Sequence, residues 1–139
     1  MSTEIKHKQL QGHKDLIVYK KAYSAAMEFF KETKQFPKEK IYSLTDQIRR
    51  SSRSVCANIA EAYRKRLYPK YFVSKLSDSD GECAETMVHL DFAKDCGYLK
   101  EDKYELILEE YIQIGKMLGS MMSSLEKFSV NKLPTAPAN

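Results

Sequence analysis

The chain has few of the residues that break a regular backbone. Five glycines and four prolines among 139 residues leave little material for the tight turns of a loop-rich β fold. No apolar run reaches the roughly 18 residues of a membrane-spanning helix. The polar opening MSTEIKHKQLQGHKD also does not have the apolar region of a signal peptide. We therefore expect a soluble, cytoplasmic protein that does not interact with membranes.

Residues for reactive chemistry are equally sparse. The three cysteines, Cys56, Cys83 and Cys96, form no CxxC pair, which predicts buried reduced thiols. The common phosphate-binding, hydrolase, zinc-protease and dinucleotide motifs do not occur. Iron-binding bundles use Glu-x-x-His pairs, whereas Glu85 precedes His89 by four residues. We expect no catalytic residues, no metal and no cofactor, and hence no enzyme.

Apolar residues recur at steps of three or four along four segments, which is the spacing of amphipathic helices. The segments cover about residues 15–36, 38–66, 69–96 and 101–128. Pro37 and Pro69 separate the first three, because the residue before a proline avoids the helical region and the proline itself suits a first helical turn. Gly97 is expected to end the third helix in a left-handed conformation.

Connections this short place sequential helices antiparallel. The sequence therefore predicts an all-α fold, an up-down-up-down antiparallel four-helix bundle over residues 15–128. Residues 1–14 show no periodicity, and the tail 129–139 (SVNKLPTAPAN) contains two prolines. We expect both segments to be disordered.

Charge is unevenly distributed along the chain. Residues 1–70 contain sixteen Lys and Arg against seven Asp and Glu, and residues 71–139 contain seven against twelve. The second predicted helix and the residues just beyond it contain the candidate binding set Arg49, Arg50, Arg53, Arg64, Lys65, Arg66 and Lys70. Guanidinium groups bind phosphate and carboxylate in bidentate fashion. Tyr63, Tyr68 and Tyr71 are placed to stack on unpaired nucleobases.

A structural explanation of the same charges remains open. The arginines of the second helix can instead form ion pairs with acids of the third, or face water; those acids are Asp78, Asp80, Glu82 and Glu85. Basic residues also favour a helix C-terminus, which accounts for residues 64–70 without any ligand. Glu61 is a candidate partner for an arginine of the same or a neighbouring subunit.

Several sequence blocks resemble those of the bacterial 23S rRNA intervening-sequence proteins, also labelled S23-type. The blocks are residues 16–22 (LIVYKKA), 36–39 (FPKE), 44–51 (LTDQIRRS), 58–62 (NIAEA), 81–86 (GECAET) and 97–99 (GYL). They occur in order across about residues 15–126. The family usually reads Asn-Ile-Ala-Glu-Gly where this chain ends in Ala62, so we expect the helix to continue there.

The resemblance implies a homopentameric barrel of four-helix bundles with no known enzymatic activity. It is also similar to the accessory variability proteins of diversity-generating retroelements, basic pentamers that bind reverse transcriptase and its template RNA. By that analogy Arg49, Arg50, Arg53 and Arg64 are candidates for the surface that faces nucleic acid or polymerase. We expect a non-enzymatic oligomeric scaffold that binds RNA, with a reverse transcriptase as a candidate partner. The alternative is a protein–protein interaction module that binds no nucleic acid.

Overall fold

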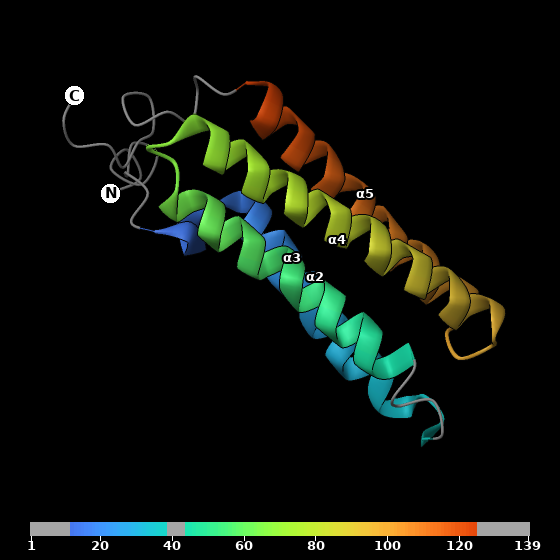
Figure 1. Ribbon diagram of the computed structural model, residues 1–139. Coiled ribbons are helices and arrows are strands. Elements are labelled where there is room, and N and C mark those ends of the chain that lie inside the picture. Colours follow the sequence, from blue (N-terminus) through green and yellow to red (C-terminus); the bar gives the residue numbers. More distant parts are fainter. Residues whose placement is uncertain (1–11, 39–43, 125–139) are drawn as a thin grey trace, which may run out of the picture.

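A computed structural model of the chain describes residues 12–38 and 44–124. Within these ranges all regular structure is helical (Figure 1). A short 3-10 turn, η1 (His13–Asp15), precedes α2 (Ile17–Glu32), which continues into the 3-10 turn η2 (Thr33–Gln35). The remaining helices are α3 (Asp46–Arg64), α4 (Pro69–Asp95) and α5 (Glu101–Ser123).

The four long helices form the predicted four-helix bundle. α2 and α4 each pack against both α3 and α5, so α2 and α4 occupy diagonal positions in the bundle (Figure 1). The predicted tail 129–139 lies outside the described residues. So does the predicted arm 1–14, except for its last three positions. None of the described helices has a stretch long and apolar enough to cross a membrane.

Proline and glycine set several helix boundaries as predicted. Pro69 occupies the first turn of α4. Gly97 adopts a φ of 80° after α4, where the amide of Tyr98 donates to the carbonyl of Ala93 and the amide of Gly97 donates to that of Lys94, both at 2.9 Å. These two hydrogen bonds form a Schellman motif. α3 also runs unbroken through the buried Ala62, as expected.

The predicted start of the second helix at residue 38 borders on residues that the structure does not describe. The α-helix begins at Asp46, after a π-type turn at residues 44–45, and residues 39–43 lie outside the described part. Phe36 is extended and buried, with its ring centroid 5.6 Å from that of Tyr98. Phe36 therefore covers the end of the bundle beside Tyr98.

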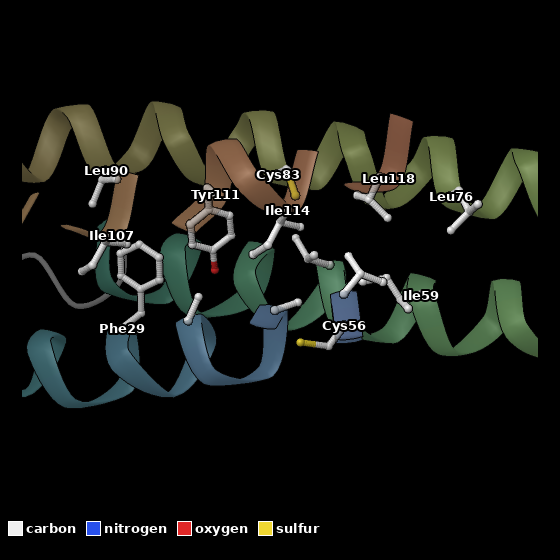
Figure 2. Packing of buried hydrophobic residues seen from close by; sticks show 14 of the residues in the cluster. Phe29, Cys56, Ile59, Leu76, Cys83, Leu90, Ile107, Tyr111, Ile114 and Leu118 are labelled. Atoms are coloured by element: carbon white, nitrogen blue, oxygen red, sulfur yellow. The ribbon is translucent and has the colours of Figure 1, made fainter. Parts of the chain in front are cut away.

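The core lies between the four helices and is shown in Figure 2. Phe29 of α2 and Tyr111 of α5 pack with ring centroids 5.7 Å apart. The largest fully buried aliphatic side chains are Ile48, Val55, Ile59, Leu76, Leu90, Ile114 and Leu118. Because such side chains exclude water from all four helices, they supply most of the driving force for the fold.

Small polar residues fill the contact between α3 and α4. The buried Ser79 hydroxyl donates to the carbonyl of Val55 at 2.9 Å, and the buried hydroxyl oxygens of Thr86 and Ser51 lie 2.8 Å apart. Short side chains allow the two helices to approach closely, and the hydrogen bonds satisfy the hydroxyl groups in the absence of water. Ser51 thus marks the packing face of α3 toward α4.

Candidate nucleic-acid interface

The seven predicted basic residues do not form one surface. Arg49 and Arg53 line a groove between α2 and α3. Arg50 points toward α4, where its ion-pair partners lie. The other four, Arg64, Lys65, Arg66 and Lys70, gather where α3 ends and α4 begins. We refer to residues 64–71 as the α3–α4 corner.

Arg50 is neutralised within the bundle. Its guanidinium lies 3.6 Å from a Glu82 carboxylate oxygen and forms a close ion pair with Glu85. Although burial opposes the shift, the hydrogen bond from Arg50 holds the pKa of Glu85 below its ordinary value. For this arginine the structural explanation accounts for the charge. Asp78, another of the expected acidic partners, instead lies 3.8 Å from Lys75.

Arg49 stabilises the end of α2. Its Nε donates to the Thr33 hydroxyl at 2.8 Å and one Nη donates to the Phe30 carbonyl at 3.3 Å. The guanidinium also lies 4.8 Å from the centroid of the Phe30 ring. A cation at a helix C-terminus satisfies free carbonyls and complements the helix dipole. Arg49 therefore has a structural role that the sequence did not indicate.

Three bases of the α3–α4 corner face solvent. Arg64 and Lys70 are exposed, and their side chains form no hydrogen bond or ion pair with any described residue. Lys65 is also exposed, and its ammonium lies 5.5 Å from the centroid of the Tyr71 ring. Arg66 differs, because it folds back to donate to the Tyr63 carbonyl at 2.9 Å and lies 4.1 Å from the Tyr63 ring. The corner thus presents three cations outward and uses the fourth internally.

Two tyrosines accompany these cations. Tyr68 and Tyr71 are 58% and 62% exposed, and their rings meet edge to face with centroids 6.3 Å apart. Tyr63 was expected to share this role, but it is buried in the core at the end of α3. The prediction of base stacking therefore applies to Tyr68 and Tyr71 alone.

The corner contains no acidic residue. No Asp or Glu occurs between Glu61 and Asp78 in the sequence. Glu61 was expected to meet an arginine, but it pairs with Lys75 of α4 at 2.8 Å. The hydrogen bond that the Lys75 ammonium donates to Glu61 raises the pKa of Lys75 above its ordinary value. This pair engages the carboxylate that is nearest in sequence to Arg64 and Lys65.

Comparison with known proteins assigns the fold to a family. A sequence model described as 23S rRNA-intervening sequence protein matches residues 14–120. The chain belongs to this family. A solved structure, that of a protein of unknown function from the S23 ribosomal protein family of Bacteroides thetaiotaomicron, is 27% identical with a TM-score of 0.71. The match covers 78% of this chain and 96% of that chain. No curated protein matches the chain.

This member of the intervening-sequence family also has a groove that the sequence did not predict. It has a volume of about 450 Å³ and lies between α2 and α3. Its apolar wall is Tyr19, Tyr23, Ala26, Met27 and Phe30. Tyr23 and Phe30 belong to a stripe of apolar residues at helical spacing in α2, yet both are exposed. The core positions are Val18, Ala22, Ala25 and Phe29, because α2 carries two apolar stripes and only one faces inward.

The thiols and carboxylates of this family member form no reactive cluster in the described part of the chain. No group of three or more His, Cys, Asp or Glu side chains there is arranged to hold a metal ion. Burial raises the pKa of Cys56 to about 11 and that of Cys83 to about 12. Cys96 is exposed, so the expectation of three buried thiols is wrong for this residue. It follows the last turn of α4, where the chain turns away from the core.

Proposed function

We propose that this protein is a non-enzymatic oligomeric scaffold that binds RNA at the α3–α4 corner. The observation that carries the proposal is the set of solvent-facing cations Arg64, Lys65 and Lys70 beside two exposed tyrosines, with Glu61 paired to Lys75. Of the seven basic residues predicted from the sequence, these three are best placed to meet a phosphate backbone. Arg50, neutralised by two glutamates, contributes little to such a surface.

The chemistry of the corner favours recognition of backbone and of unpaired bases. Lysine and arginine neutralise phosphates and release counterions, which gives binding that depends steeply on salt. Each base stacked on an aromatic side chain adds about 1–3 kcal/mol and is tolerated in any sequence. Tyr68 and Tyr71 offer such faces beside the cations. We therefore expect the corner to prefer RNA with single-stranded loops or ends over a continuous duplex.

The family description supports the choice of RNA. The family is named after the intervening sequence of 23S rRNA, so a structured fragment of ribosomal RNA is a suitable first ligand. We further propose a homopentamer, since a ring repeats the basic corner five times and multiplies phosphate contacts. By analogy with the retroelement accessory proteins, a reverse transcriptase is the protein partner to test.

Charge reversal at the corner tests the proposal. The triple variant Arg64→Glu, Lys65→Glu, Lys70→Glu should lose binding to a fluorescent RNA stem-loop, as measured by anisotropy. The control reverses Lys14, Lys20 and Lys116, which are exposed residues outside the corner. Both variants change the net charge equally, so loss confined to the first would show that the corner is the binding surface. Equal loss in both, or binding retained by the first, would contradict the proposal.

The second candidate function is a protein–protein interaction module without nucleic acid. The apolar groove between α2 and α3 favours it, because its exposed aromatic residues suit a protein surface better than a phosphate backbone. A wild-type protein that assembles normally but binds no RNA even at low salt would favour this candidate.

A further inference from the structure

We propose that the groove between α2 and α3 receives the outward face of α4 from a second copy of the chain. The inference deepens the oligomeric part of the proposed function, since it rests on self-association and names the two surfaces that would meet. It does not depend on RNA binding at the α3–α4 corner.

The groove presents an apolar surface that the bundle itself does not cover. Tyr23 is 53% exposed, and Met27 and Phe30, one and two turns further along α2, are 43% and 40% exposed. On the α3 side the wall consists largely of small residues, Ser52, Cys56, Ala57 and Ala60. Large apolar side chains on α2 beside small side chains on α3 leave room for another helix. Contiguous exposed apolar patches of this kind mark interaction sites.

The outward face of α4 has the complementary shape. Gly81, Ala84, Val88 and Phe92 follow one another at steps of three or four, so they lie on one side of the helix. All four are exposed, and Val88 and Phe92 are 51% and 58% exposed. At 100° per residue, Val88 lies about 160° from the buried Leu90. A Cβ added at Gly81 would meet nothing within 4 Å, so this small residue serves no packing within the chain.

Charge at the two surfaces is also complementary. Arg53 lines the groove, is exposed and makes no ion pair with any residue that the structure describes. The outward face of α4 is bordered by the exposed Asp80, Asp91 and Asp95, of which Asp91 accepts from the Tyr104 hydroxyl at 2.7 Å and Asp95 lies 3.7 Å from the Lys94 ammonium. Apolar contact at the centre with opposite charges at the rim is the usual anatomy of a protein interface. This pairing gives Arg53 a carboxylate partner on the neighbouring copy and removes it from the RNA-binding set.

The positions of the two surfaces determine the symmetry of the contact. α2 and α4 are diagonal in the bundle (Figure 1), so one chain cannot place its own α4 face in its own groove. A contact between two different surfaces is heterologous, and it closes into a ring or extends as a filament. The resemblance to pentameric proteins concerns the number of subunits. The groove and the outward face of α4 specify which helices of neighbouring subunits touch.

Complementation between two damaged variants tests the pairing. Met27→Glu damages the groove and leaves the α4 face intact, whereas Val88→Glu does the reverse. Light scattering after size exclusion should find each variant monomeric alone. An equimolar mixture should give a dimer and nothing larger, since one intact contact remains. Leu106→Glu is the control, because Leu106 is 64% exposed but lies between α2 and α5; this variant should keep the wild-type mass.

Three results would overturn the inference: a monomeric wild type, a wild-type mass for either single variant, or a mixture that stays monomeric. Circular dichroism checks the fold, and Tyr23→Ser with Phe92→Ser repeats the test with milder changes. RNA binding is measured separately through Arg64, Lys65 and Lys70. Failure of RNA binding therefore leaves the assembly result standing, and failure of assembly leaves the corner testable.

Discussion

Lys75 Nζ lies 2.8 Å from Glu61 Oε1, and this ion pair joins the last turns of α3 to the first turns of α4. Glu61 is the last acidic residue before the corner, and the next is Asp78. Lys75 pairs with this carboxylate, and neither Arg64 nor Lys65 forms an ion pair with a described residue. The solvent-facing cations of the corner are the basis of the proposed RNA site.

Truncation of a buried leucine should destabilise the fold far more than truncation of an exposed one. Leu90 is fully buried in α4, and Leu106 of α5 is 64% exposed. Leu90→Ala should lower the free energy of unfolding by about 2–5 kcal/mol through lost burial and a residual cavity. Leu106→Ala should change it by less than about 0.5 kcal/mol. Equal effects in urea unfolding would show that the inner and outer faces are wrongly assigned.

The hydroxyl pair between α3 and α4 should behave as a coupled unit. Thr86→Val removes the 2.8 Å bond and leaves the Ser51 hydroxyl only its 3.4 Å bond to the Ile48 carbonyl, whereas Ser51→Ala leaves the Thr86 hydroxyl bonded to the Glu82 carbonyl alone. Each should cost about 0.5–1.5 kcal/mol of stability, and the double variant should cost less than the sum of the two, because the same hydrogen bond is lost in all three variants. Urea unfolding of all four proteins gives the coupling free energy. Simple additivity of the two single changes would rule out the interaction.

The ion pair between α2 and α5 should contribute a pH-dependent term to stability. Lys103 donates to Glu28 at 3.0 Å and holds the pKa of Glu28 below its usual 4.5. The pKa of Glu28 is lower in the folded chain than in the unfolded chain, so the stabilisation by the pair is complete above pH 4.5. It is lost as the pH falls through the lower pKa that Glu28 has in the folded chain. Lys103→Gln should therefore lose less stability on acidification than the wild type.

Urea unfolding at neutral pH and at about pH 3 measures this difference. Lys116→Gln is the control, because Lys116 is exposed and forms no ion pair with the described residues. An acid-induced loss that is the same in both variants would show that the Glu28–Lys103 pair contributes nothing.

One thiol per chain should react rapidly in the native protein. Cys96 is exposed, whereas Cys56 and Cys83 are buried, with pKa values raised to about 11 and about 12. A thiolate is the reactive form, so an aromatic disulfide reagent near neutral pH should label Cys96 alone and all three cysteines after denaturation. Cys96→Ser should abolish the rapid phase. Rapid reaction of Cys83, which is fully buried, would mean that the core opens readily.

The sequence predicted the helices better than the contacts between them. Pro69 and Gly97 act through local backbone preferences, so the start and end of α4 followed from the sequence. The burial of Phe36 against Tyr98 did not, because it is a contact between distant segments. For α2, the two apolar stripes differ by one helical position, and periodicity alone does not say which of them faces the core.

The partners of charged residues were also beyond sequence reasoning. Arg50 and Arg53 are three residues apart and lie near one side of α3, yet Arg50 meets two glutamates and Arg53 meets none in the described part of the chain. The difference depends on the register of α4 against α3, which the packing of Ser51, Ser79 and Thr86 sets. Helical spacing gives the face of a side chain but not the residue that it meets.

The salt dependence of RNA binding tests the central claim most directly. Binding of single-stranded RNA is measured from low to moderate salt for the wild type and for the uncharged variant Arg64→Gln, Lys65→Gln, Lys70→Gln. Each lost phosphate contact should reduce the slope of log K against log salt by about 0.7, hence by about 2 for each subunit that contacts the RNA. Identical slopes for the two proteins would show that the α3–α4 corner does not bind the backbone.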